Sequence, residues 1–223
     1  MERIDDHSAA RRNAFAAIYA GHDWLGESRS GPGSDPKRTR SYRGLIQTFL
    51  RDHQIKTVLD IGCGDWSFGR LIDWSALHYT GVDVVEEVVE ANRARYGAPN
   101  VAFACLDAVN DAIPAADLVL VKEVMQHLPV ADIEALLTKL AAYPFAIVVN
   151  DISHEKRDNW RGRWRWRSVC STNTDIGPGG YRLLDLRQPP FSVAATRLLA
   201  YENQYRDLRW VKEVLLLAGD ATR

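Results

Sequence analysis

The most informative part of this 223-residue chain is the segment Val58-Leu59-Asp60-Ile61-Gly62-Cys63-Gly64-Asp65-Trp66. An apolar run reaches Asp60, turns at once through Gly62 and Gly64, and continues into a helix-like segment at residues 67–72. This order predicts a strand, a tight turn and a helix, with a nucleotide-sized ligand site at the carboxyl end of the strand. Glycines suit that turn because a side chain would keep the backbone from approaching a ligand closely.

The spacing of the acid and the glycines indicates which ligand the turn takes. A dinucleotide fingerprint would need a third glycine where Ser67 stands. The pattern Asp60-x-Gly62-x-Gly64 instead resembles the first motif of the class I S-adenosylmethionine-dependent methyltransferases. This resemblance, which is strongest over residues 41–150, implies S-adenosyl-L-methionine as cofactor and S-adenosyl-L-homocysteine as product.

Later strand ends agree with this resemblance. Residues 78–83 read as a second strand that ends in Asp83, where a carboxylate can take both ribose hydroxyls. Residues 100–104 read as a third strand, and the resemblance implies that Asp107 beyond it accepts from the adenine amino group. The implied cofactor-binding residues are Asp60, Gly62, Cys63, Gly64, Asp83, Val84, Asp107, Ala108, Lys122 and Trp24.

The alternation of strands and helices predicts an α/β fold. We expect a Rossmann-like methyltransferase fold: a mostly parallel seven-stranded sheet with an antiparallel edge strand and helices on both faces. The other expected elements are strands at 117–121, 145–150, 193–201 and 208–217 and helices at 42–52, 84–96 and 131–142.

Two regions outside the sheet are expected to control access to the site. Residues 1–40 should form an N-terminal helix at 8–20, for which Ser8 is the candidate N-cap, and a covering loop. Residues 41–223 should form the methyltransferase domain, with a substrate or lid insertion at about 152–190. Trp24 precedes a Gly-, Ser- and Pro-rich loop and could close over the cofactor; the alternative is that Trp24 is simply buried beneath a surface loop.

Residues 160–167 contain three tryptophans and four arginines. Such a stripe can bind an anionic or glycan substrate, with Arg163, Trp164 and Arg165 as the contacts. The alternative is that the rings pack inward and the arginines are solvated. Single-stranded nucleic acid is not the expected partner because the chain has a net charge of −1 and no second basic tract.

A polar stretch at 171–176, followed by a Gly/Pro turn, also suits substrate contact. Asn173 and Tyr181 are its candidate contact residues. An ordinary connection between elements would have the same composition, so the sequence leaves both interpretations open.

Catalytic residues are sought where the fourth and fifth strands end. Methyl transfer from a sulfonium is an in-line displacement, so positioning and desolvation can supply much of the acceleration, and a base is needed only for a protonated acceptor. His127 could be that base; in several methyltransferases that this tract resembles, the corresponding histidine is structural. Asn150 and Asp151 end the fifth strand, with His154 just beyond, and they are comparable candidates for orienting the acceptor.

Composition is that of an ordinary globular protein, with 46% hydrophobic and 26% charged residues. The cysteines at 63, 105 and 170 are too widely spaced to predict a disulfide framework or a zinc site, and no metal is expected. Residues 1–20 lack a signal-peptide core, and no apolar run is long enough for a membrane span. A reduced, cytoplasmic setting is the default expectation.

These observations predict an S-adenosylmethionine-dependent methyltransferase that acts on oxygen or nitrogen of a small polar or anionic metabolite or a glycan. Neither nucleic acid nor a membrane is an expected partner. Two alternatives remain: a nicotinamide-dependent oxidoreductase on the same fold, and a non-catalytic module that binds S-adenosylmethionine. The sequence leaves the acceptor and the oligomeric state open.

Overall fold

A computed structural model describes residues 2–21 and 28–217, and its centre is one mixed sheet. The strand order is β3-β2-β1-β4-β5-β8-β7, and β6 pairs with β5 outside this path. The first five strands pair in parallel, whereas β8 is antiparallel to both β5 and β7. The strands are β1 (Thr57–Ile61), β2 (His78–Asp83), β3 (Val101–Cys105), β4 (Leu118–Lys122), β5 (Phe145–Trp160), β6 (Arg163–Ser168), β7 (Ala195–Tyr205) and β8 (Leu208–Leu217).

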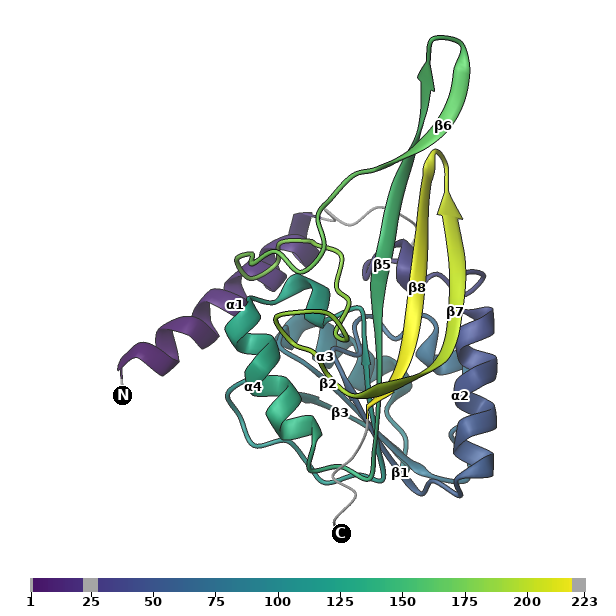
Figure 1. Cartoon of the computed structure of the whole chain (residues 1–223). Coiled ribbons are helices and arrows are strands. Elements are labelled where there is room, and N and C mark those ends of the chain that lie inside the picture. Colours follow the sequence, from purple (N-terminus) through teal and green to yellow (C-terminus); the bar gives the residue numbers. More distant parts are fainter. Residues whose placement is uncertain (1, 22–27, 218–223) are drawn as a thin grey trace.

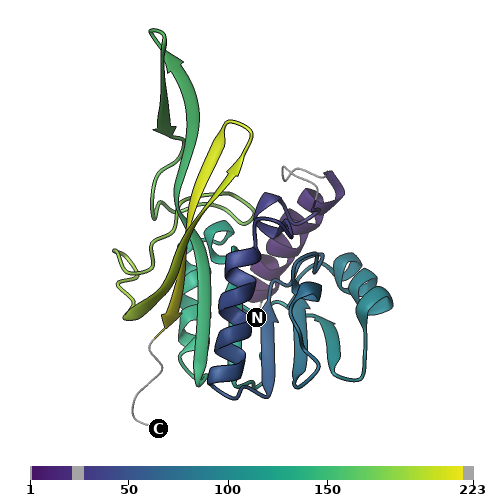
Figure 2. The same cartoon turned by 90° about the vertical axis from the view of Figure 1, so that its right-hand side faces the viewer.

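Helices cover both faces of this sheet, which explains the continuous apolar runs in its central strands. All five residues of β4 are buried. In Figures 1 and 2, α1 and α4 lie on one face and α2 lies on the other. The helices are α1 (Glu2–Gly21), α2 (Arg40–Asp52), α3 (Glu86–Tyr96) and α4 (Val130–Leu140), with 3-10 turns η1 (Pro32–Ser34), η2 (Gly69–Leu71) and η3 (Met125–His127).

The expected Rossmann-like fold is confirmed, with two differences in the sheet. It has eight strands rather than seven, because β6 adds to it. The antiparallel strand β8 lies between β5 and β7 and is therefore not at the edge. Among the helices of residues 2–21 and 28–217, none is long and apolar enough to cross a membrane.

Two local predictions, the helix at residues 67–72 and the N-cap role of Ser8, are wrong because serine side chains form hydrogen bonds with aspartates instead. Residues 67–72 form only the short turn η2, because Asp65 accepts both the backbone N–H and the hydroxyl of Ser67. Ser8 does not cap α1; it lies inside the helix, and its hydroxyl donates to Asp107 at 2.6 Å.

The region at 152–190, expected to be a substrate or lid insertion, begins as a regular hairpin. β5 continues to Trp160 and pairs with β6, and this hairpin extends from the carboxyl edge of the sheet beyond the β7–β8 hairpin (Figures 1 and 2). Arg161 and Gly162 join the strands with φ values of 52° and 76°, as a two-residue hairpin turn requires.

Candidate functional site

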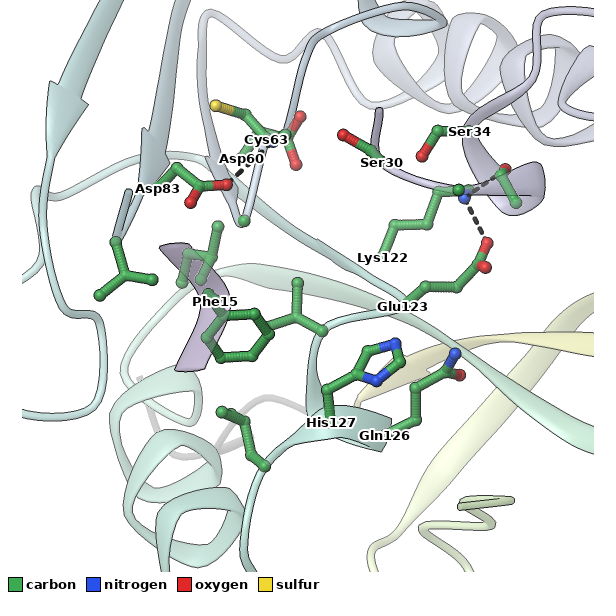
Figure 3. A pocket seen from close by; sticks show the side chains of 18 of the residues that line it. Phe15, Ser30, Ser34, Asp60, Cys63, Asp83, Lys122, Glu123, Gln126 and His127 are labelled. Atoms are coloured by element: carbon green, nitrogen blue, oxygen red, sulfur yellow. Dashed lines mark hydrogen bonds and ion pairs between the residues drawn. The ribbon is translucent and has the colours of Figure 1, made fainter. Parts of the chain in front are cut away.

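A cavity of about 310 Å³ opens at the carboxyl edge of the sheet, a volume typical of a small-molecule site (Figure 3). It has two parts, which we call the glycine half and the polar half. The glycine half includes Asp60, Gly62, Cys63, Gly64, Asp83, Val84, Asp107 and Ala108 from β1, β2, β3 and the loops that follow them. The polar half includes Lys122, Glu123, Gln126, His127, Asp151, His154, Tyr181, Trp210 and Lys212.

The turn after β1 has a backbone that only glycine fits. Gly62 and Gly64 have left-handed φ values of 71° and 57°. A Cβ on Gly62 would lie 2.3 Å from Cγ2 of Val124, and a Cβ on Gly64 would lie 2.4 Å from Oγ of Ser30. The turn is therefore held closely on both sides, and its backbone forms part of the cavity wall.

Asp83 ends β2 with its carboxylate among the lining groups of the cavity. Its Oδ2 accepts from the backbone N–H of Gly64 at 3.1 Å, and its Oδ1 accepts from that of Val85 at 3.1 Å. Burial raises the pKa of Asp83. Each carboxylate oxygen can accept more than one hydrogen bond, so this geometry fits a ligand that offers two hydroxyl donors.

Asp60 lines the same half and is hydrogen-bonded by Tyr79. The phenol donates to Oδ2 at 2.7 Å, and burial of the carboxyl raises the pKa of Asp60 to about 7. The carboxyl therefore changes its protonation near neutral pH, in contrast to an exposed aspartate.

This raised pKa predicts how stability depends on pH. The ordinary pKa is 3.8, so as pH rises the unfolded chain releases this proton before the folded chain does, and Asp60 destabilises the fold increasingly between about pH 4 and 7. Asp60→Asn removes that effect. The difference in free energy of unfolding between Asp60→Asn and wild type should therefore shift in favour of the variant by about 1.4 kcal/mol for each pH unit of increase within this window. Denaturant titrations at pH 5 and pH 7 measure this difference, and Asp52→Asn, at an exposed position, is the control. The prediction is contradicted if the free energies of unfolding of the two variants change equally between these pH values.

Asp107 is held by the N-terminal helix. Arg11, only 3% exposed, donates to Oδ2 at 2.9 Å, Ser8 donates to the same oxygen, and the Val109 N–H donates to Oδ1 at 3.1 Å. Burial opposes ionisation, but the hydrogen bonds from Arg11 and Ser8 hold the pKa of Asp107 below its ordinary value. The carboxylate is therefore already satisfied by protein groups, and an adenine amino group would have to share it with Arg11.

A loop following α1 covers the glycine turn. Oδ2 of Asp65 accepts from the hydroxyl of Ser28 at 2.8 Å and from the backbone N–H of Arg29 at 3.0 Å. The Asp65 N–H in turn donates to the hydroxyl of Ser30 at 2.8 Å. Residues 30–34 line the cavity, as a covering loop would. Trp24 lies outside the described residues.

The polar half is built around four buried charges. Glu123 pairs with Lys122 through one oxygen and with Lys212, at 2.7 Å, through the other. Lys212 also pairs with Asp151 at 2.5 Å, and Lys122 donates to the carbonyl of Gly33 in the covering loop at 2.8 Å. Burial opposes ionisation of Glu123, but the two ammonium groups lower its pKa to about 2. Glu123 has a left-handed φ of 58°, a costly conformation that these contacts stabilise.

A β-bulge in β5 directs two predicted residues into this half. Asp151 pairs with Lys212, and His154 pairs with Trp210. Asp151 and His154 are three positions apart along β5, whereas Lys212 and Trp210 are only two positions apart along β8. Without the extra residue, Asp151 and His154 would point to opposite faces of the sheet. The bulge therefore places both side chains in the cavity wall.

His154 is the least satisfied polar group of this half. Its ring stacks on Trp210 at 4.7 Å and meets Tyr181 edge-on at 5.5 Å. Within residues 2–21 and 28–217, neither ring nitrogen has a hydrogen-bond partner, and burial lowers the pKa of His154. Buried polar atoms are almost always paired, so these nitrogens are suited to a bound ligand.

His127 is oriented by the segment that follows β6. Its Nδ1 lies 2.7 Å from the carbonyl oxygen of Gly180, and a carbonyl can only accept, so Nδ1 carries the proton. Burial lowers the pKa of His127, as it does for His154. Tyr181 adjoins this contact and donates to Oδ2 of Asp151 at 2.9 Å.

Thirteen of the eighteen predicted site residues line the cavity. They are Asp60, Gly62, Cys63, Gly64, Asp83, Val84, Asp107, Ala108, Lys122, His127, Asp151, His154 and Tyr181. Arg163, Trp164 and Arg165 lie instead on the β5–β6 hairpin. Asn173 organises a loop by donating to the carbonyls of Asp185 and Pro189, at 2.9 and 2.8 Å.

The sequence interpretation missed the cavity residues that belong to distant elements. Arg11, Phe15 and Tyr19 come from α1, and Trp210 and Lys212 come from β8. The pattern around Phe15 and Tyr19 indicates a buried helix face but not what that face covers. No group of three or more metal-binding side chains occurs within the part of the chain that the structure describes.

Comparisons with known proteins agree with this geometry. Residues 58–144 match the family model described as a methyltransferase domain. The N-methyltransferase NodS from Bradyrhizobium japonicum, in complex with S-adenosyl-L-homocysteine, is 15% identical, with a TM-score of 0.56 over 92% of this chain and 98% of that one. Magnesium protoporphyrin IX methyltransferase from Synechocystis PCC 6803, with bound S-adenosylmethionine, is 14% identical, with a TM-score of 0.54 over 96% and 94%.

A third similarity is more local. The methyltransferase domain of bacterial CtHen1 is 25% identical over 49% of this chain, with a TM-score of 0.44, and this chain spans 64% of that one. No curated protein has a significantly similar sequence. At these identities the solved structures establish the fold that the chain shares with them.

Proposed function

We propose that this chain is a class I S-adenosylmethionine-dependent methyltransferase that transfers the methyl group to an oxygen or nitrogen of a small polar acceptor bound in the polar half. One observation carries this proposal. A single cavity is lined both by the glycine turn and by His154, whose ring nitrogens have no partner among the described residues.

The glycine half fits the cofactor in its chemistry. Gly62 and Gly64 present bare backbone to the cavity and would admit the methionyl part, and Asp83 can accept from both ribose hydroxyls. The adenine role of Asp107 remains a proposal in which Arg11 shares the carboxylate. When bound, S-adenosylmethionine supplies a methyl group activated by its sulfonium.

The polar half would orient the acceptor and accept its proton. A neutral imidazole can take the proton of an O–H or N–H group, and the lowered pKa of His154 keeps it neutral at pH 7. Asp151, fixed by Lys212 and Tyr181, holds the neighbouring wall rigid. Both ammonium groups of this half are already paired with carboxylates, which favours a polar rather than an anionic reacting end in the cavity.

Cofactor binding is the first expected outcome. We expect S-adenosylmethionine to bind with a micromolar dissociation constant, and NADH not to bind. Asp83→Ala should weaken S-adenosylmethionine binding at least about tenfold, because a well-placed charged hydrogen-bond partner contributes about 1.5–3 kcal/mol. Isothermal titration calorimetry measures this, with the exposed Asp73→Ala as matched control. Equal affinities for wild type and Asp83→Ala would contradict the assignment.

Turnover distinguishes an enzyme from a module that only binds the cofactor. Radiolabelled methyl groups should pass from S-adenosylmethionine to a small hydroxyl- or amine-bearing acceptor in a screen of polar metabolites and glycans. His154→Gln should abolish most of this transfer while calorimetry still detects the cofactor. Cofactor binding without transfer to any member of the screen would favour the binding module.

A further inference from the structure

We infer that the acceptor has a phosphate-bearing arm that lies along one face of the β5–β6 hairpin, outside the cavity. We call this face the basic face; its cations are Lys156, Arg163, Arg165 and Arg167. The inference rests on the proposed function, because it extends the acceptor from the polar half of the same cavity.

The pairing register places these cations on the cavity side of the hairpin. His154 points into the cavity, and residues two apart along a strand share a face, so Lys156 and Asp158 follow it on that side. Directly paired residues of an antiparallel ladder also share a face. Lys156 pairs with Arg167 and Asp158 pairs with Arg165, which brings the β6 arginines to the same side.

On the opposite face of the hairpin, the arginines contact aromatic rings and a carboxylate of the protein itself. There the guanidinium of Arg157 lies over the ring of Trp164 at 4.8 Å, and that of Arg209 lies over Trp166 at 4.5 Å. Arg209 is also paired with Glu155. These stacks stiffen the projecting ribbon, so Trp164 and Trp166 serve the structure of the hairpin, while Lys156, Arg163, Arg165 and Arg167 carry the charge of the basic face.

The basic face is an exposed, positively charged surface. Its four cations meet two carboxylates, Asp158 and Asp207, and the side chains of Lys156 and Arg167 are 59% and 60% exposed. Their acidic contacts are loose: Lys156 lies 3.7 Å from Asp207, and Arg167 lies 3.4 Å from Asp158. Exposed pairs of this kind contribute little, so a phosphate can displace them. Arginine forks bind phosphate oxygens in a bidentate manner.

The spacing of the cations defines the shape of the arm. Strand residues rise about 3.4 Å each, so Lys156 and Arg167 lie roughly 7 Å beyond His154. Arg163, which pairs with Trp160 at the tip, lies roughly 20 Å beyond it. A single phosphate cannot reach both positions, so the fitting ligand has a row of phosphates at about 7–20 Å from the methylated atom.

Inorganic polyphosphate is the probe that tests this inference without knowledge of the acceptor. The triple variant Arg163→Gln/Arg165→Gln/Arg167→Gln should bind it at least tenfold more weakly than wild type in calorimetry at low salt. The matched control Arg157→Gln, on the opposite face of the same hairpin, should remain within about twofold of wild type. The affinity for S-adenosylmethionine should be the same in all three proteins, which shows that each is folded.

Three results would overturn the inference. These are equal polyphosphate binding by wild type and the triple variant, an equal loss in Arg157→Gln, and binding to phosphatidylserine vesicles with none to polyphosphate, which would assign the hairpin to a lipid surface. None of them depends on methyl transfer. A chain that fails to bind S-adenosylmethionine but binds polyphosphate through the basic face would therefore refute the proposed function separately.

Discussion

Replacing His154 with glutamine is expected to lower kcat for methyl transfer by about 10²–10⁴, the usual contribution of a general base. Glutamine keeps a hydrogen-bonding group of similar reach but cannot take a proton. The ring nitrogens of His154 have no hydrogen-bond partner among the described residues, so the substitution breaks no hydrogen bond there and changes the ring contacts with Trp210 and Tyr181. The acceptor KM should change much less than kcat.

The pH profile separates a catalytic His154 from a structural one. Burial lowers its pKa from the ordinary value of 6.5, so the basic form persists below pH 6.5. The acid limb of kcat/KM in wild type should therefore lie below pH 6.5 and should disappear in His154→Gln. A structural role would reduce activity at every pH equally and leave the limb in place.

Two other histidines provide the controls. His127→Gln should lower kcat less than His154→Gln, because Nδ1 of His127 is committed to the carbonyl of Gly180 and the ring mainly fixes that segment. His78→Gln, at the exposed start of β2, should leave kcat unchanged. If His127→Gln proves the more damaging variant, the base assignment must move from the end of β5 to the end of β4.

The glycine half was accessible to sequence analysis because local chemistry dictates it. A strand that ends in a Gly-x-Gly turn needs left-handed backbone at Gly62 and Gly64, and no other residue supplies it without strain. The acid at the end of the next parallel strand follows from the same geometry, because parallel strands bring their carboxyl ends to one edge. The position of Asp83 at the site is therefore predictable from the order and the ends of the first two strands.

The polar half depends on pairing that no local pattern reveals. Lys212 and Trp210 face the cavity because β8 pairs antiparallel with β5, which brings Lys212 to Asp151 across a separation of 61 residues in the chain. His154 shares that face with Asp151 only through a one-residue bulge, and a one-residue change in register reverses every side chain beyond it. Arg11 is likewise unpredictable, since its partner Asp107 belongs to an element that α1 meets only in the folded protein.

For the β5–β6 hairpin, the sequence pattern predicts the faces of the strand correctly but not its position relative to the cavity. Alternation of Trp and Arg in residues 163–167 correctly places the two residue types on opposite faces. The sequence does not reveal that β5 continues to Trp160, so that residues 163–167 lie outside the cavity lining. The anionic preference derived from it therefore applies to a surface outside the cavity, where it becomes a property of the acceptor's remote part.

Lys212→Met is expected to lower the free energy of unfolding by about 3–5 kcal/mol, the cost of leaving buried charges without their partner. The ammonium is buried and shared by Glu123 and Asp151, at 2.7 and 2.5 Å. Burial favours deprotonation of this lysine, but the two carboxylates raise its pKa above the ordinary value. Urea titrations at pH 7 measure the loss, and Lys37→Met, at an exposed position, should show little change.

The remaining carboxylates determine how this loss depends on pH. Without Lys212, Lys122 is the ammonium group left beside Glu123 among the described residues, so burial raises the pKa of Glu123 and protonation removes part of the unfavourable charge as pH falls. The stability deficit of Lys212→Met should therefore be smaller at pH 5 than at pH 8. Adding Asp151→Asn should recover part of the deficit at pH 8, because the amide can still accept from Tyr181 and carries no charge. A deficit that is constant with pH and unaffected by Asp151→Asn would mean that lost packing, rather than charge, explains the role of Lys212.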